Sequence, residues 1–373
     1  MKYFLIAGEA SGDVHGGNLM KALQEQDPQA SFRYFGGDRM QAVAPGLVIH
    51  YREMAYMGYV EVLTHLRAIS RNMKKCREAI RSFQPDVVIL IDYPGFNLRM
   101  AEFAHQQGFR VFYYISPKLW AWKQKRVKKI KAFVDRMFII LPFEKEFYRK
   151  HGIEAEFLGN PIVDEVARRQ QELVPRERFL ERMGLPHRPV IALLPGSRKQ
   201  ELQYHLPLML QLTEKYPGYL FIIAGAPTFN EEDYAPYLAN TDVKVVFNDT
   251  YNLLHAAHAA LVTSGTATLE TALMGVPQVV MYRMNKLTYH IGKYFVHVDF
   301  ISLVNLILGK EAVKELIQDD VNLPRIREEL DRILEDTPAR RQMLDNYRHL
   351  QEIMGEPDVS ARVAEKMIAA LRS

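Results

Sequence analysis

The sequence predicts an α/β protein with two Rossmann-like parallel-sheet units that face a central cleft, followed by a helical C-terminus. Runs of apolar and β-branched residues alternate with amphipathic stretches, which is typical of doubly wound sheets. The pattern stops in the polar, Pro-containing stretch 164–188 and restarts at Val190. A length of 373 residues suits two domains that each bury their own core.

The first unit is expected to begin with a strand at Lys2–Ala7, a Gly-rich turn, and a helix from about Val14 to Gln26. Further helices are expected over 61–82 and near 97–107. The remaining strands of this unit are predicted at 32–35, 47–51, 87–91, 110–115 and 136–141.

The second unit is expected to contain strands at 190–194, 219–224, 243–247, 259–263 and 278–282. From about Glu311 onward the chain is expected to be helical and charged, ending in a helix near 358–371. We therefore expect domains at 1–165 and 186–345, with a C-terminal helix at 355–373 that can pack back on the first. Two successive α/β units leave a cleft between them, which is a usual place for a ligand.

Composition limits the class of protein. Hydrophobic residues make up 48% of the chain and charged residues 25%, which is typical of a globular protein. The single cysteine, Cys76, excludes an internal disulfide and fits a reducing compartment. The apolar run near the N-terminus is too short for a signal peptide, and no run of the sequence is long enough to span a membrane. We expect a soluble protein, or one attached to a membrane surface.

Charge is distributed unevenly between the two halves. Residues 1–165 carry 24 basic against 18 acidic side chains, whereas residues 166–373 carry 24 against 26. The first half is therefore expected to meet an anionic partner.

The strongest candidate for a chemical role is Asp92. It follows the uninterrupted apolar run 87–91 and precedes Tyr93-Pro94-Gly95, which prevents a longer strand. Ligands of open α/β sheets bind at the carboxyl ends of such strands, where a carboxylate can act as a general base. The alternative is that Asp92 caps the next helix or closes a turn.

The segment Gly8–Gly17 follows the first predicted strand and opens a helix. Its glycines allow a tight turn, but the spacing of the dinucleotide-binding fingerprint is absent. Glu9, Ser11 and Asp13 lie within it and favour contacts with a polar substrate. The alternative is a tight turn without a ligand.

The segment Leu194-Pro-Gly-Ser-Arg198 ends the first strand of the second unit. Gly196 and Ser197 can present backbone N–H groups to a phosphate, which Arg198 can bind through two hydrogen bonds.

Thr263-Ser-Gly-Thr-Ala-Thr-Leu-Glu270 follows a later strand and begins a helix. A diphosphate near Ser264, Gly265 and Thr266 would gain from the free amides and the helix dipole, and Glu270 can accept hydrogen bonds from a ribose. The alternative is that these residues only cap and start the helix.

A basic segment covers Lys118–Lys131 and contains seven basic residues, no acids and both tryptophans. Charge runs are usually solvated faces, but adjacent tryptophans favour a membrane interface. The apolar stretch 54–60 lies in the same half; it can be core packing or, with the basic residues that follow it, a lipid-facing surface. The residues expected to face lipid are Met54, Met57, Tyr59, Trp120, Trp122, Lys123, Lys125, Arg126, Lys128 and Lys129. Without a nucleic-acid motif, we expect no nucleic-acid partner.

No His, Cys, Asp or Glu cluster in the sequence has the spacing of metal ligands, so no metal or other cofactor is expected.

Taken together, these motifs give the chain a resemblance to the lipid-A-disaccharide synthase family. The resemblance covers residues 8 to about 310 and rests on blocks that occur in order. These are 8–13, 57–62, 91–97, 116–126, 141–148, 194–198, 264–270, 282–284 and 304–306. Glycine stands at 95, where an acid often occurs in the family, so an acid assisting Asp92 must come from elsewhere, with Glu9 or Asp13 as first candidates.

The resemblance implies a two-domain sugar-nucleotide transferase fold (GT-B) and an inverting, metal-independent glycosyltransferase. The implied donor is UDP-2,3-diacylglucosamine and the implied acceptor is 2,3-diacylglucosamine 1-phosphate, joined β-1,6 with release of UDP. It also implies a cytoplasmic enzyme at the inner face of the bacterial cytoplasmic membrane, with an anionic membrane surface as partner. The sequence leaves a homodimer open.

The resulting hypothesis places UDP on the second unit, with Arg198 and residues 264–266 at the diphosphate, Glu270 at the ribose and Asn305 as a nearby polar contact. Asp92 on the first unit removes the proton of the acceptor hydroxyl. Two alternatives stay open: an epimerase acting on UDP-N-acetylglucosamine, and a non-catalytic peripheral membrane protein.

Overall fold

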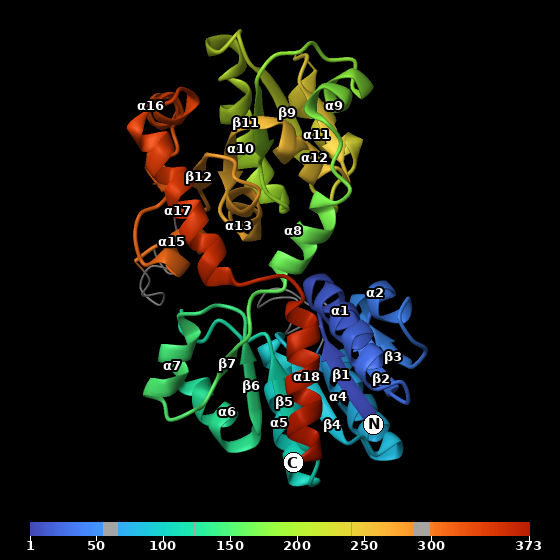
Figure 1. Cartoon of the computed structure of the whole chain (residues 1–373). Helices are drawn as coiled ribbons and strands as arrows, with labels where there is room; N and C mark the ends of the chain where they lie inside the picture. Colours follow the sequence, from blue (N-terminus) through green and yellow to red (C-terminus); the bar gives the residue numbers. More distant parts are fainter. Residues whose placement is uncertain (55–65, 122–123, 240, 286–288, 290–298) are drawn as a thin grey trace. The chain divides into compact units, whose positions relative to one another are not determined.

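The computed structural model describes residues 1–54, 66–121, 124–239, 241–285, 289 and 299–373 (Figure 1). Met57, Tyr59, Trp122 and Lys123, which the sequence places at lipid, lie outside these residues. The chain divides into two compact units, residues 1–164 with 355–373, and residues 165–354. Each unit contains one parallel β-sheet, which confirms the predicted fold class.

The sheet of the first unit has seven strands in the order β3-β2-β1-β4-β5-β6-β7, and all neighbours pair in parallel. The order reverses between β1 and β4, which is the switch point where such sheets bind ligands. The strands are β1 (Lys2–Ala7), β2 (Ser31–Gly36), β3 (Leu47–His50), β4 (Val87–Ile91), β5 (Arg110–Tyr114), β6 (Arg136–Ile139) and β7 (Glu156–Phe157).

Helices cover both faces of this sheet, because alternate residues of the central strands are apolar on each side. The helices are α1 (Ala10–Gln26), α2 (Asp38–Gln41), α4 (Leu66–Phe83), α5 (Pro94–Gln106), α6 (Val127–Phe133), α7 (Glu144–Lys150) and α18 (Val359–Arg372), with 3₁₀ turns η1 (Tyr51–Glu53) and η2 (Gln124–Arg126). One face packs against α1 and α18, and the other against α4, α5, α6 and α7.

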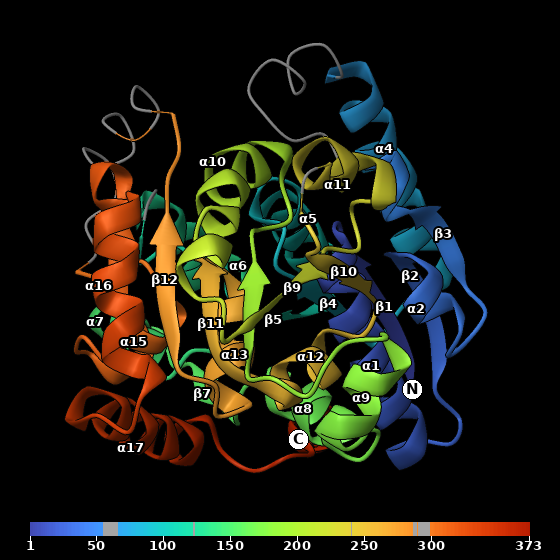
Figure 2. The same cartoon turned by 90° about the horizontal axis from the view of Figure 1, so that it is seen from above.

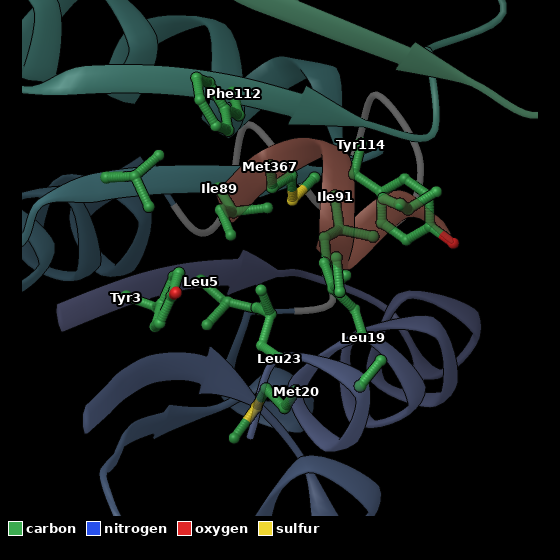
Figure 3. Packing of buried hydrophobic residues seen from close by; sticks show 14 of the residues in the cluster. Tyr3, Leu5, Leu19, Met20, Leu23, Ile89, Ile91, Phe112, Tyr114 and Met367 are labelled. Carbon is green, nitrogen blue, oxygen red and sulfur yellow. The ribbon is translucent and has the colours of Figure 1, made fainter. Parts of the chain in front are cut away.

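Figure 3 shows the core beneath α1 and α18, where Leu23 of α1 lies next to Leu5 of β1 and Leu19 belongs to the same cluster. Met367 of α18 lies close to Ile91 of β4 in the same cluster. The last helix of the chain therefore completes the core of the first unit.

The sheet of the second unit has six strands in the order β10-β9-β8-β11-β12-β13, and Figure 2 shows β11 and β12 side by side. Its order reverses between β8 and β11. The strands are β8 (Val190–Leu194), β9 (Leu220–Gly225), β10 (Lys244–Phe247), β11 (Ala257–Thr263), β12 (Gln278–Tyr282) and β13 (Lys314–Ile317). The helices are α8 (Ile162–Gln170), in which the division between units falls, then α9 (Arg176–Arg182), α10 (Lys199–Leu210), α11 (Glu231–Leu238), α12 (Thr250–Ala256), α13 (Thr266–Leu273), α15 (Leu303–Leu308), α16 (Leu323–Leu334) and α17 (Pro338–Met354), with 3₁₀ turns η3 (Thr213–Lys215) and η4 (Gln318–Asp320).

Two sequence predictions about elements are wrong. The helix expected from about Val14 begins at Ala10, so most of the Gly-rich segment is helix and not turn. The region after Glu311, expected to be helical, contains strand β13, which pairs with β12.

Candidate active site

Asp92 lies at the switch point of the first sheet. It directly follows β4, whose last residue, Ile91, is paired with Ala7, the last residue of β1. The turn after β1 carries Gly8 and Glu9. Glu9 and Asp92 therefore follow the ends of two neighbouring strands, β1 and β4. This is the position where an α/β sheet presents side chains to a ligand.

The backbone at Asp92 is held in an unfavourable conformation. Asp92 and Tyr93 both have left-handed φ values, 42° and 48°, which are uncommon for residues other than glycine. The Asp92 carbonyl accepts hydrogen bonds from Tyr113 Oη at 2.6 Å and Asn97 Nδ2 at 2.7 Å. Strain of this kind, fixed by surrounding contacts, is common at functional sites.

Glycine at position 8 follows from this geometry. A Cβ at Gly8 would lie 2.3 Å from Cδ1 of Tyr93, so only glycine lets the ring cross the end of β1. The Tyr93 hydroxyl donates to the Met54 carbonyl at 2.9 Å.

The capping alternative for Asp92 does not match the structure. Helix α5 begins at Pro94, and its N-cap is Tyr93, without a side-chain capping bond. The Asp92 carboxylate is therefore not committed to the start of that helix.

The electrostatic surroundings of Asp92 suit a proton acceptor. Burial raises the pKa of Asp92 to about 6, and the negative charge of Glu9 raises it as well. The positive charge of Lys118 and the Tyr93 N–H act in the opposite direction. A carboxyl with a pKa near the working pH is both ionised and basic enough to take a proton.

Asp13, expected beside Asp92 as a second acid, has a different role. It is 3% exposed, and its carboxylate accepts backbone N–H bonds from Gly37 (2.6 Å), Arg39 (3.0 Å) and Met40 (3.1 Å). These bonds hold the start of α2, so the assignment of Asp13 to proton transfer is corrected. Ser11 is exposed on the first turn of α1.

Gly196, Ser197 and Arg198 lie at the switch point of the second sheet, directly after β8. The Ser197 and Arg198 amides both donate to Oε2 of Glu201, at 2.9 and 3.2 Å, in the first turn of α10. The Ser197 amide, one of the two expected to be free for a phosphate, is therefore occupied by a carboxylate, as is the Arg198 amide. The Arg198 guanidinium is exposed and lies 3.4 Å from Glu201 Oε1.

The segment after β11 reaches the same switch point. Helix α13 begins at Thr266, and its N-cap is Gly265, so no side chain caps the helix start. The Ser264 hydroxyl donates to the Ile301 carbonyl at 3.3 Å. Gly265 and Thr266 are exposed. The free start of α13 therefore matches the expected place for an anion.

Glu270 is partly buried and paired with a residue that the sequence did not single out. Tyr251 Oη donates to Glu270 Oε1 at 2.7 Å. Burial raises the pKa of Glu270, the Tyr251 hydroxyl lowers it, and the charge of Glu165 raises it. The bond fixes one carboxylate oxygen.

Asn305 is corrected to a structural residue. It is fully buried, and its amide nitrogen donates to the Val313 carbonyl and to Glu315 Oε1, both at 2.9 Å. Its amide oxygen accepts from the Ala312 and Val313 N–H groups. With these groups occupied, Asn305 joins α15 to β13 and does not reach a substrate.

The residues expected to face lipid fall into two sets. Met54 is 1% exposed in the core, which contradicts a lipid-facing role. Trp120 is half-buried, with its ring edge-on to Phe143 at 4.9 Å. Lys125, Lys128 and Lys129 are exposed and Arg126 is partly exposed; Lys129 pairs with Glu102 at 2.7 Å.

Sequence reasoning missed the charge of Lys118 that lowers the pKa of Asp92. It also missed the Glu201 carboxylate that accepts from the Arg198 amide and the Tyr251 hydroxyl that donates to Glu270. Only Glu201 had a usable signal, since a glutamate three residues after an N-cap often reaches back to it. The other two are brought in by tertiary packing.

A protein family described as lipid-A-disaccharide synthetase matches residues 3–368. The chain belongs to this family. A lipid-A-disaccharide synthase from Geobacter sulfurreducens is 40% identical over 370 residues, which cover 97% of this chain and 95% of the relative. One from Syntrophus aciditrophicus is 39% identical over 99% of this chain and 97% of the relative. The expected enzyme class, a glycosyltransferase of lipid A biosynthesis, is thereby confirmed.

Solved structures of similar shape agree on the fold. UDP-GlcNAc 2-epimerase from Neisseria meningitidis, bound to UDP-GlcNAc, has a TM-score of 0.70 at 13% identity and covers 99% of this chain and 100% of its own. The calicheamicin glycosyltransferase CalG4 has a TM-score of 0.63 at 16% identity, covering 100% of this chain and 98% of its own. At these identities the two structures show only that the fold is of the GT-B type. The epimerase alternative is therefore supported by fold similarity alone.

Proposed function

We propose that this family member joins two acylated sugars, with Asp92 as the general base. In this reaction Asp92 removes the proton of the 6-hydroxyl of 2,3-diacylglucosamine 1-phosphate. The oxygen forms a bond to the anomeric carbon of UDP-2,3-diacylglucosamine, and the bond to UDP breaks, with its electron pair leaving on the diphosphate. Attack opposite the leaving group inverts the anomeric centre, so one carboxylate is sufficient. The observation that carries the proposal is the half-buried, strained Asp92 with its raised pKa at the switch point.

The second unit is proposed to bind UDP. Exposed Arg198 and the free start of α13 supply the positive charge and N–H groups that a diphosphate needs as charge develops on it. Glu270 is proposed to accept from the ribose through the oxygen that Tyr251 leaves free. The first unit, with Glu9 near Asp92, is proposed to bind the acceptor.

No group of three or more His, Cys, Asp or Glu side chains in the described part of the chain is arranged to hold a metal ion. The proposed transfer needs no metal ion, and this independence from metal is itself a prediction.

The test is turnover of Asp92→Asn with UDP-diacylglucosamine and its 1-phosphate acceptor, followed by mass analysis of the disaccharide. Loss of general-base assistance predicts a fall in kcat of roughly 10²–10⁴-fold, with UDP affinity unchanged. Asp86→Asn, at the exposed opposite end of β4, is the matched control and should keep wild-type turnover. Near-normal turnover of Asp92→Asn would remove Asp92 from this role, and failure of the wild-type protein to form disaccharide or release UDP would overturn the proposed reaction.

We further propose that the first unit attaches to an anionic membrane surface at the inner face of the cytoplasmic membrane. The exposed lysines of the basic segment, Lys125 and Lys128, support this, since each basic residue near such a surface contributes about 1 kcal/mol. No described helix has the length and apolar character needed to cross a bilayer.

Changing both lysines to glutamine is expected to weaken binding to vesicles containing anionic lipid by roughly tenfold or more in a sedimentation assay. Wild-type binding should also fall as salt rises. The matched control is Lys310 and Lys314 changed to glutamine in the second unit. Salt-independent binding, or equal loss in the control, would count against the electrostatic role of the segment.

A further inference from the structure

The backbone of Asp92 is held by hydrogen bonds on both sides of its Cα atom. On one side, the Asp92 carbonyl accepts from Tyr113 Oη at 2.6 Å and from Asn97 Nδ2 at 2.7 Å. On the other side, the Asp92 N–H donates to the Ile115 carbonyl at 3.2 Å. The φ of 42° between them is a left-handed value that aspartate adopts less readily than an extended or helical one. These bonds therefore stabilise a conformation that the chain does not favour by itself.

Asn97 connects the Asp92 carbonyl to the ends of two strands. It is fully buried in the first turn of α5, where its backbone N–H donates to the Tyr93 carbonyl at 3.0 Å. Its Nδ2 atom also donates to the Ile91 carbonyl of β4 at 3.1 Å and to the Ile6 carbonyl of β1 at 3.3 Å. One amide group therefore reaches three carbonyls at the switch point between β1 and β4.

The acceptor half of the Asn97 side chain does not contribute to stability. Its Oδ1 atom is buried and has no hydrogen-bond partner in the part of the chain that the structure describes. A buried acceptor without a donor is destabilising, and an apolar side chain at this position would avoid that cost. The role of the residue therefore lies in the donor half of the amide, which meets the three carbonyls.

The position of the Asp92 carboxylate depends on this backbone. The φ and ψ angles of a residue determine which side-chain rotamers it can adopt and in which direction they extend. Among the described residues, no side chain forms a hydrogen bond or an ion pair with the Asp92 carboxylate. The backbone, fixed through its carbonyl and its N–H, therefore sets where the carboxylate lies.

We propose that Asn97 and Tyr113 are positioning residues that hold the Asp92 backbone in its left-handed conformation and thereby place its carboxylate for proton transfer. The inference rests on the proposed role of Asp92. A general base must lie within hydrogen-bond reach of the proton that it removes, and a displacement of about 1 Å can lower a rate on the order of 10²-fold. Both residues act through the Asp92 carbonyl and take no part in the proton transfer itself.

The test begins with the kinetics of two variants. Tyr113→Phe removes one donor and keeps the ring, so kcat should fall roughly tenfold while the KM of the acceptor and the affinity for UDP stay within about twofold. Asn97→Ala removes the second donor and should lower kcat by roughly 10²-fold. In the Asp92→Asn background neither change should lower kcat by more than about twofold, because both act through the same carboxylate.

Matched controls remove equivalent hydrogen bonds elsewhere in the first unit. Tyr34 of β2 is fully buried, and its hydroxyl donates to the Ala44 carbonyl at 2.7 Å, so Tyr34→Phe matches Tyr113→Phe. Asn160 is 4% exposed, and its Nδ2 donates to the Ile140 carbonyl at 3.0 Å, so Asn160→Ala matches Asn97→Ala. The controls should lower the melting temperature as the test variants do and keep wild-type kcat. An equal fall of kcat in variants and controls would overturn the inference.

A second measurement follows the carboxyl itself. The pKa of Asp92 is measured by carboxyl ¹³C NMR in protein labelled at aspartate, with the signal assigned by its loss in Asp92→Asn. Burial is the main cause that raises this pKa to about 6, so a carboxylate that is no longer held should gain water, and its pKa should fall by about half a unit or more in Tyr113→Phe and Asn97→Ala. The charges of Glu9 and Lys118, which also act on this carboxyl, are kept in both variants. The two controls should leave the pKa at its wild-type value.

The same measurements separate this inference from the proposed function. A lower melting temperature with unchanged kcat and unchanged pKa of Asp92 would mean that Asn97 and Tyr113 only stabilise the fold, and it would overturn the inference. If Asp92→Asn keeps its turnover while Tyr113→Phe and Asn97→Ala lower the NMR pKa, the proposed function fails and the positioning of the Asp92 carboxylate stands. If Asp92→Asn is inactive but both variants keep the wild-type kcat and pKa, only the inference fails.

Discussion

At the scale of single residues, two carboxyl groups of the candidate active site, those of Asp13 and Asp92, have different surroundings. Asp13 accepts three backbone N–H bonds and is thereby committed to structure. Asp92 is half-buried, the charges of Glu9 and Lys118 act on it in opposite directions, and burial raises its pKa to about 6. The same residue type therefore serves as a structural anchor in the first turn of α1 and as a candidate base at the end of β4.

The raised pKa of Asp92 has a consequence for stability. A carboxyl whose pKa rises from 3.8 to about 6 on folding is ionised less readily in the folded state. Below its unfolded pKa, Asp92 is protonated in both states and does not change the free energy of unfolding. As pH rises through about 6, ionisation of Asp92 lowers the free energy of unfolding. Asp92→Asn removes this charge and should raise the free energy of unfolding by roughly 1–3 kcal/mol above about pH 7, with little change near pH 4. Urea unfolding at both pH values measures it; an equal change at both would mean that packing, not charge, is responsible.

At the scale of elements, the strands were the most predictable feature. Strands β1, β4, β8 and β12 have the predicted bounds, because uninterrupted apolar runs are buried on both faces of a parallel sheet. The start of α1 was not predictable, since glycine indicates a turn. In the structure a Cβ at Gly16 would lie 2.7 Å from Met40 Sδ, so this glycine allows the helix to approach α2 closely.

The candidate site was predictable in part. Strand ends followed by Asp92, Arg198 and Glu270 were found from sequence, because period and turn residues fix where a strand stops. Asn305 and Met54 were misplaced, since the sequence does not show which side chains turn inward.

At the scale of the whole molecule, the first unit is discontinuous in sequence. Residues 355–373 belong to it although residues 165–354 form the second unit. Asp164 holds this return by accepting from the Val359 and Ser360 N–H groups at 2.9 and 3.1 Å. The core of the first unit therefore stays incomplete until the last helix has been synthesised.

This arrangement predicts that a change in the last helix acts on the first unit alone. Met367 is fully buried against α1 and β4, so Met367→Ala should lower the free energy of unfolding of the first unit by about 2–5 kcal/mol. Lys366→Ala, one residue earlier and exposed, is the matched control and should change it by less than about 0.5 kcal/mol. Hydrogen exchange measured by mass spectrometry should show faster exchange in β1, β4 and α1 of Met367→Ala, while β8 and β11 keep wild-type protection. Equal loss of protection in both sheets would show that the two units unfold together, and unchanged protection would show that α18 does not support the first core.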